Sequence, residues 1–290
     1  MKTLYKATIS PTSSFITPLK GDTIFGQMCW AVRFKYGKEK LENLLSDYEK
    51  NPFLIVSDGF VSGYLPKPNM PSDLLKEKTE DKKQNRKKIW LRLDELQKGK
   101  FSHAKTDKEV GNFEKKEPII RNALNYKTFH TGDGFDPYSL EETSLGKKDI
   151  YLLSDERLKK DELKELLEFV GLYGYGKKAT IGKGRFEVDS FEQIVLPKSS
   201  KRFMALCAFS PEGLECKNIY YNTFVRFGKT GSQRATTNAF KKPLILADCK
   251  AVVEFEEKKE LSYIGKAIKN ISTYKDIVHQ GYSIVVAIGE

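Results

Sequence analysis

Residues Gly171–Phe186 combine glycine, tyrosine and cationic side chains in a way that suits the binding of a phosphodiester backbone. These sixteen residues contain five glycines, two tyrosines and four lysine or arginine residues. Glycine permits positive φ and lets a ligand approach the main chain, and the backbone N–H groups of such a loop can form a nest for an anion. Cations balance phosphate charge, and tyrosine rings stack on bases. The loop therefore predicts an RNA-binding seat made of Tyr173, Gly174, Tyr175, Gly176, Lys177, Lys178, Gly182, Lys183, Gly184 and Arg185. The alternative is a flexible interdomain connector whose lysines serve solubility.

Two better-known phosphate-binding motifs do not fit this loop. A P-loop needs four residues between its first glycine and the Gly-Lys-Ser/Thr ending, whereas five residues separate Gly176 from Gly182 and no hydroxyl residue follows the lysine. The letters of Gly174–Ala179 match a dinucleotide fingerprint, but that motif needs a strand before the loop and a helix after it. Here a helical pattern precedes the loop and the strand-like run Arg185–Val188 follows it. We therefore expect no nucleotide cofactor.

Other cations extend the predicted RNA-binding set beyond the loop. One group lies in a second basic, glycine-containing stretch, where RNA contact and a merely exposed loop remain open interpretations. A second group lies in a predicted hairpin, whose ordinary surface would look similar, and one lysine precedes a predicted helix. These further candidates are Lys20, Arg121, Lys127, Arg226, Lys229 and Arg234.

Histidine chemistry offers a rival interpretation, because histidine is the usual general base near neutral pH. Only His103, His130 and His279 are available. His130 is the best placed, since it follows Tyr126 and Lys127, which can stabilise a pentavalent phosphate. Single histidines near lysines are also common on ordinary surfaces, and no paired-carboxylate or Ser/Cys nucleophile pattern accompanies them.

The charge of the chain favours an acidic polymer as partner. The net charge is +11, and Gly171–Lys242 alone contains 13 Lys+Arg against 5 Asp+Glu. Positive charge concentrated in this way favours nucleic acid over a membrane surface. The alternative is a lysine-rich surface that serves solubility.

Cysteine usage and hydropathy argue against a metal centre and a membrane anchor. Cys29, Cys207, Cys216 and Cys249 form no C-x-x-C pair and have no histidine at zinc-ligand spacing. We expect reduced core cysteines and no metal. The N-terminal residues show no apolar signal segment, and no apolar run approaches the roughly 18 residues that a membrane span requires. We expect a cytoplasmic protein.

Two helices must position the loop and the residues before it. Ile24, Met28 and Val32 recur at i, i+4 and i+8 and predict a helix that opens at Gly21. Apolar residues on one face of Asp161–Val170 predict a second helix that ends at the loop. Residues 69–118 are rich in lysine and glutamate, and their mixed charge predicts a mobile, solvated insertion.

The remaining pattern is dominated by strands. Arg121–His130 and Lys148–Leu153 are predicted to pair as a long hairpin around the turn Thr131–Gly134. After residue 198 strand patterns prevail, with one short helix expected at Ile264–Ile271. The order predicts an α+β fold of two tandem ferredoxin-like (RRM-like) domains. Their predicted ranges are 1–197, including the insertion and the glycine-rich loop, and 198–290.

Several segments resemble a known family in their order and spacing. They are Lys20–Gly26, Leu65–Pro68, Lys88–Leu96, Asn122–Thr128, the glycine loop and His279–Tyr282. The succession resembles the RAMP-superfamily proteins that form the fourth subunit of type III-A CRISPR (Csm) complexes. The similarity spans nearly the whole chain, although Lys20 stands where a small polar residue is expected.

The resemblance implies a binding subunit and not the nuclease. Such a subunit grips the 5′ handle of the crRNA, caps the backbone filament and docks the large polymerase-like subunit. The backbone subunit is a further partner, and target RNA is met indirectly. The resemblance also implies a β-hairpin thumb, for which residues 121–150 are the candidate. Two alternatives stay open: a metal-independent RAMP endoribonuclease that processes precursor crRNA, and a scaffold that binds only other subunits.

Overall fold

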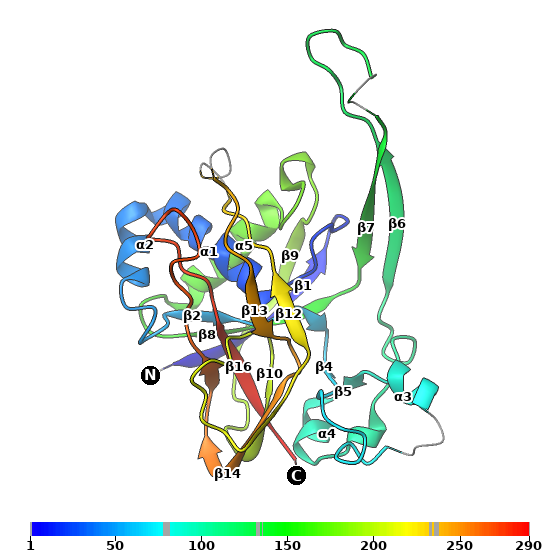
Figure 1. Cartoon of the computed structure of the whole chain (residues 1–290), viewed down its shortest axis with the longest axis vertical. Helices are drawn as coiled ribbons and strands as arrows, with labels where there is room; N and C mark the ends of the chain where they lie inside the picture. Colours follow the sequence, from blue (N-terminus) through cyan, green and yellow to red (C-terminus); the bar gives the residue numbers. More distant parts are fainter. Residues whose placement is uncertain are drawn as a thin grey trace.

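The computed structural model describes residues 2–77, 82–131, 134, 136–231, 234 and 238–289. Figure 1 shows a body with two main β-sheets, from which a long β-hairpin projects. The expected α+β class is confirmed, since helices and antiparallel sheets are both present.

The first sheet is formed by strands of the N-terminal two thirds: β1 (Thr3–Pro11), β2 (Leu54–Val56), β3 (Phe60–Val61), β8 (Lys148–Ser154) and β9 (Phe186–Ile194). Its order is β2-β8-β1-β9, with β3 also on β8, and every pair is antiparallel. Strand β8 is buried at every position, as expected for a central strand with both faces covered.

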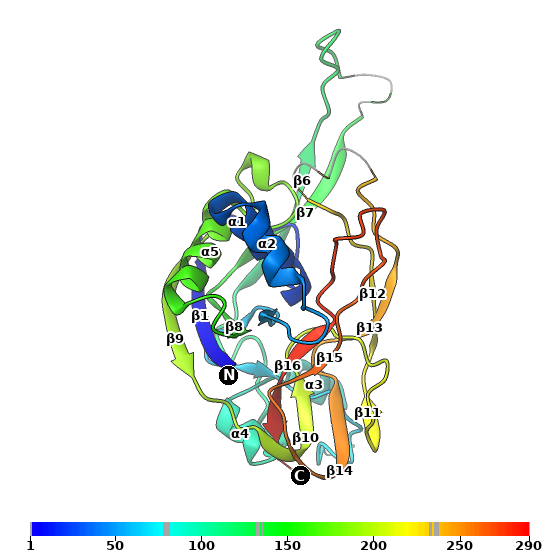
Figure 2. The same ribbon diagram turned by 90° about the vertical axis from the view of Figure 1, so that its left-hand side faces the viewer.

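Two helices position the loop. The predicted helices are present as α1 (Gly21–Tyr36) and α5 (Lys160–Tyr173), and the short α2 (Lys38–Leu45) follows α1. They lie side by side in both views (Figures 1 and 2), and the Tyr36 hydroxyl donates to a Glu165 carboxylate oxygen at 3.0 Å. Helix α5 ends at Tyr173 and is followed by Gly174, whose φ of +95° lies in the region that favours glycine.

The second sheet repeats the strand order of the first. Its strands are β10 (Ser199–Ala205), β11 (Asn218–Tyr220), β14 (Val252–Glu260), β15 (Tyr263–Gly265) and β16 (Tyr282–Ile288). The order is β11-β14-β10-β16-β15, so that β11, β14, β10 and β16 correspond to β2, β8, β1 and β9. All pairs are again antiparallel.

The prediction of a short helix at Ile264–Ile271 is wrong. The structure contains no α-helix in the described part of the C-terminal half, residues 198–231, 234 and 238–289. Tyr263–Gly265 is strand β15, and Ile268 forms an isolated bridge with His279. Gly265 has a φ of +89°, and a Cβ there would lie 2.2 Å from the Gly281 carbonyl oxygen. A close antiparallel approach of two segments therefore replaces the helical turn.

The two halves share one hydrophobic core. The main apolar cluster joins α1 and α5 residues to Met204, Tyr282 and Val286 of the second sheet. The Gln280 side chain accepts from the Val56 amide at 2.9 Å and donates to the Val56 carbonyl at 2.8 Å. Residues 195–198 connect β9 to β10.

Part of the 69–118 region is packed, and the expectation of a solvated insertion is wrong for that part. Lys82–Lys87 has no buried residue and residues 113–118 are exposed, as expected. The region contains α3 (Lys82–Lys87), β5 (Trp90–Leu91), α4 (Leu93–Gln97) and a 3₁₀ turn at Phe101–His103, and β5 pairs with β4 (Leu65–Pro66). Leu75, Leu91, Leu96 and Phe101 are buried in the main core. The Gly289 amide donates to the Leu96 carbonyl at 2.8 Å, so the region also contacts the C-terminal half.

A long hairpin is present, but neither of its strands is the predicted one. The predicted first strand, Arg121–His130, shares only Arg121 with the observed first strand. Strand β6 (Glu114–Arg121) pairs along its length with β7 (Tyr138–Leu145), and the hairpin extends away from the body in Figure 1. The predicted partner, Lys148–Leu153, belongs to β8 in the first sheet. Its apolar side chains demand burial on both faces, whereas β7 is largely exposed. Part of the predicted turn, residues 132–133, lies outside the described residues.

The cysteines are free thiols, with Cys207 and Cys249 buried and Cys29 and Cys216 partly exposed. Among the described residues no three His, Cys, Asp or Glu side chains gather as metal ligands. In the same part of the chain no helix has the length and apolar character to cross a membrane.

Candidate nucleic-acid interface

The glycine-rich loop after α5 is a tightly packed bend. Gly174, Gly176, Gly182 and Gly184 all have φ between +72° and +95°. A Cβ at Gly184 would lie 2.1 Å from the Tyr175 carbonyl oxygen, and one at Gly176 would lie 2.5 Å from the Thr17 side chain. Close approach of the chain to itself, and not only access for a ligand, therefore requires glycine here.

The predicted anion-binding nest does not form from three of its four glycine amides. The Gly174 amide donates to the Val170 carbonyl, the Gly182 amide to Ala179 and the Gly184 amide to Ser14, each at 2.9 Å. These N–H groups already have partners inside the protein, so they are not available to a phosphate.

The prediction that Tyr175 stacks on a base is wrong, because its side chain is wholly buried. Its hydroxyl donates to the Pro18 carbonyl at 2.7 Å and accepts from the Lys20 amide at 3.0 Å. Burial raises the pKa of this hydroxyl. Tyr173 differs, since its ring is exposed and stacks on Phe169 with the ring centroids 4.3 Å apart.

Three cations of the loop remain accessible and unpaired. Lys177 and Arg185 are exposed and Lys178 is half-buried. Within the described ranges none of the three forms an ion pair with a carboxylate. The Lys178 ammonium lies 5.9 Å from the centre of the Tyr138 ring on β7, so the loop lies beside the hairpin. These three side chains form the free part of the predicted seat, and we call them the loop cations.

Glu142 on β7 engages two other predicted RNA contacts. Its carboxylate lies 2.7 Å from Arg121 Nη2 and also pairs with Lys183 Nζ, while the Ser14 hydroxyl donates to it at 2.6 Å. Burial opposes ionisation of Glu142, but the bonds from Lys183, Ser14 and Arg121 lower its pKa to about 2. Arg121 and Lys183 therefore tie the hairpin to the loop. The sequence pattern gave no signal for Glu142.

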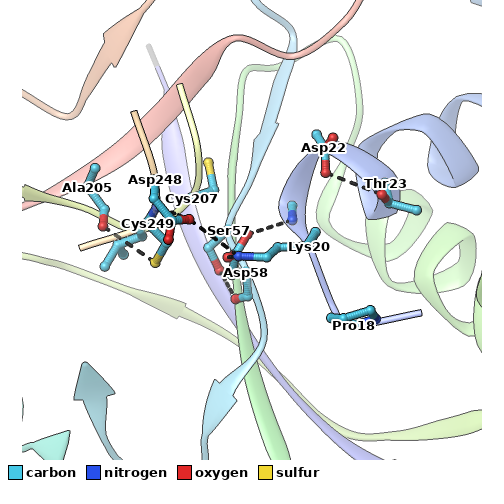
Figure 3. Close-up of polar contacts among 12 residues, drawn as sticks. Pro18, Lys20, Asp22, Thr23, Ser57, Asp58, Ala205, Cys207, Asp248 and Cys249 are labelled. Atoms are coloured by element: carbon cyan, nitrogen blue, oxygen red, sulfur yellow. Dashed lines mark hydrogen bonds and ion pairs between the residues drawn. The ribbon is translucent and has the colours of Figure 1, made fainter. Parts of the chain in front are cut away.

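Lys20 is placed between the two halves and not at the loop surface, and its contact with RNA stays a prediction. Its ammonium lies 2.8 Å from an Asp58 carboxylate oxygen and 3.6 Å from Asp248 (Figure 3). Burial works against the charge, yet the two carboxylates raise the pKa of Lys20 above its ordinary value.

The second predicted basic set divides into paired and unpaired members. Arg226 Nε lies 2.6 Å from Asp22 Oδ2, and Arg234 makes two bonds to the Asp276 carboxylate at 3.0 and 2.6 Å. Lys229 is exposed, and its ammonium lies 4.3 Å from the centre of the Phe240 ring. Only Lys229 of this set is thus free of a carboxylate partner in the described structure.

The three histidines lie in different environments. His130 and the neighbouring Lys127 are exposed in the hairpin. His103 Nδ1 lies 3.6 Å from Glu95, and His279 is buried with Nε2 3.7 Å from Asp22 Oδ2. Burial lowers the pKa of His279 to about 4, although Asp22 opposes the shift.

Comparison with solved structures identifies the fold over the full chain. The crystal structure of a Csm1–Csm4 cassette with AMPPNP has a chain 16% identical, with a TM-score of 0.59 and coverage of 100% of this chain and 98% of that chain. The same cassette with cA4 gives 16% identity, a TM-score of 0.60 and the same coverage. A Csm3–Csm4 subcomplex in the type III-A CRISPR-Cas interference complex gives 14% identity, a TM-score of 0.59 and coverage of 100% of both chains.

Sequence comparison agrees with these structures. No curated protein sequence matches the chain. The sequence model of the RAMP superfamily matches residues 11–187, which is more than half of the chain and includes α1, the hairpin, α5 and the glycine loop. This chain therefore belongs to the RAMP superfamily.

Proposed function

We propose that this chain is the Csm4-type subunit of a type III-A CRISPR (Csm) effector complex. Csm4 is the subunit named in both kinds of assembly that the chain resembles, the Csm1–Csm4 cassette and the Csm3–Csm4 subcomplex. The matched chains are covered to 98% and 100%, so the likeness is not confined to one module. In this proposal the two sheets with one strand order are tandem ferredoxin-like domains that meet near residue 197.

The proposed task of the subunit is to grip the 5′ handle of the crRNA. The observation that carries this proposal is that Lys177, Lys178 and Arg185 have no carboxylate partner among the described residues, in a loop that lies beside the hairpin. Unpaired cations gathered in one place gain counterion-release free energy when phosphates bind. The hairpin β6–β7 then serves as the thumb, with Lys127 near its tip.

The proposed partners follow from the same assemblies. The chain would contact the large polymerase-like subunit on one side and the backbone subunit on another, capping the filament. Target RNA would be met only through its pairing with the guide.

We propose that the subunit carries out no catalytic step. Acid–base cleavage of RNA needs a histidine within hydrogen-bond reach of its proton, commonly supported by a second group. His279 is buried. His103 is exposed with Nδ1 3.6 Å from Glu95, but it lies in the turn Phe101–His103, outside both the loop and the hairpin. His130 is exposed, and no carboxylate within the described ranges pairs with it.

Incubation of the purified protein with repeat RNA in EDTA tests this function. We expect salt-sensitive binding without cleavage. Specific cleavage that disappears in His130→Ala, but persists in the matched His103→Ala variant, would establish the endoribonuclease alternative. Binding to other Csm subunits with no salt-sensitive RNA binding would establish a scaffold.

A further inference from the structure

A two-stranded ribbon in the C-terminal half carries an unusual outer face. Strands β12 (Thr223–Arg226) and β13 (Leu244–Ala247) pair in antiparallel register, with Val225 opposite Ile245. The pairing continues beyond the strands, since the Lys241 amide donates to Gly228 at 2.9 Å and the Thr230 amide donates to Ala239 at 2.7 Å. In Figure 2 the ribbon runs along the right-hand edge of the body.

The two faces of this ribbon alternate in burial. Residues 224, 226, 228 and 230 are buried or half-buried, while residues 223, 225, 227 and 229 are exposed. The inner face is held on the start of α1, where Arg226 pairs with Asp22. The outer face therefore belongs to a fixed element and is not a loose loop.

Large apolar side chains occupy that outer face. Phe227 is 72% exposed, Phe240 is 71% exposed and Ile245 is 73% exposed. Soluble proteins seldom leave such neighbouring side chains uncovered unless the surface binds something. Lys229 lies opposite Phe240 in an isolated bridge and places its ammonium 4.3 Å from the centre of that ring.

The charged residues of the ribbon indicate the type of partner. Asn218–Ala247 contains no aspartate or glutamate but five lysine or arginine residues. With 39 acidic residues in 290, a stretch of this length has about four on average. A segment without carboxylates of its own, with exposed rings and an adjacent ammonium group, matches the stacking and charge requirements of single-stranded nucleic acid.

We propose that the outer face of this ribbon is a second RNA-binding surface, on which Phe227 and Phe240 stack bases while Lys229 contacts a phosphate. The proposal extends the proposed RNA-binding function to a surface other than the loop cations. The ligand is a single strand, because bases inside a duplex do not expose their faces to side chains.

The test distinguishes binding through aromatic stacking from binding through apolar contact area alone. Phe227→Leu/Phe240→Leu keeps apolar side chains on the ribbon but removes the aromatic faces. Affinity for a fluorescein-labelled single-stranded RNA bearing a crRNA handle should fall by about tenfold or more, since one stacked base contributes about 1–3 kcal/mol. Phe227→Trp/Phe240→Trp should restore it, and the salt dependence of binding should not change in either variant. Phe34→Ala, which removes a ring 54% exposed on α1, is the control and should have no effect.

The outcomes separate this proposal from the proposed function. If the leucine variant binds RNA like the wild type while the loop-cation variant does not, the ribbon proposal is overturned and the loop seat stands. If the leucine variant alone loses affinity, the ribbon is supported and the loop seat fails. Unchanged RNA affinity in the leucine variant, with loss of subunit binding in Phe227→Asp/Phe240→Asp, would show that the ribbon docks a protein instead.

Discussion

Replacing Lys177, Lys178 and Arg185 together by alanine is expected to reduce the salt dependence of RNA binding while leaving the fold intact. Ten cations were predicted to contact RNA, and within the described structure five of them have no carboxylate partner: Lys127, Lys177, Lys178, Arg185 and Lys229. Each phosphate contact to a single strand contributes about 0.7 to the slope of log K against log[salt]. Five contacts give a slope near −3.5, and loss of the loop cations reduces it to about −1.4.

The difference is large enough to measure by fluorescence anisotropy with labelled handle RNA. Between roughly 50 and 200 mM salt the wild-type affinity should fall by about 130-fold and that of the triple variant by about sevenfold. Lys38→Ala/Lys98→Ala/Lys164→Ala removes equal charge from lysines that pair with acidic residues one helical turn away, and it serves as the matched control. An unchanged slope in the loop variant, or an equal loss in the control, refutes the assignment of the loop cations to RNA.

Three further predictions concern how the loop is built. Gly184→Ala should lower the free energy of unfolding by about 2 kcal/mol more than Gly182→Ala in urea titrations, because both have positive φ but only Gly184 is crowded by protein atoms; equal losses would contradict the packing argument. Tyr175→Phe should destabilise the protein by about 1–3 kcal/mol through its lost bonds to Pro18 and Lys20 without altering the RNA salt slope, and a changed slope would show that this ring meets RNA. The folded-state pKa of Glu142 lies below its ordinary value of 4.5, so ionised Glu142 stabilises the fold above about pH 4.5 and this contribution is lost as the pH falls toward 2. Glu142→Gln should therefore be less stable than the wild type at pH 7, with the gap closing as pH falls through that window; a gap that is constant with pH would count against the ion pairs.

The periodic parts of the fold could be predicted from the sequence. The stripe through Ile24, Met28 and Val32 correctly indicated α1, and the apolar face before the loop indicated α5. Strand pairing was harder to predict, because register depends on long-range contacts. The apolar run Lys148–Leu153 is predicted to be a strand of the hairpin but belongs to β8 in the first sheet. A continuous apolar run does not reveal which neighbouring strands and helices cover it.

The candidate site was predicted only in part, for a similar reason. The composition of the loop indicated phosphate chemistry, but glycine serves both ligand approach and close self-packing, and the letters do not distinguish these uses. Tyr175 was expected at the surface and is a core residue. Whether a lysine is free depends on distant carboxylates such as Glu142 for Lys183 and Asp58 for Lys20, which spacing along the chain does not disclose.

Ultraviolet crosslinking and mass spectrometry of the chain assembled with its Csm partners and crRNA test the central proposal most directly. Crosslinks from the 5′ handle should fall on peptides that contain Lys177, Lys178 and Arg185. Handle crosslinks confined to other surfaces of the chain, or found only on partner subunits, would contradict the proposal.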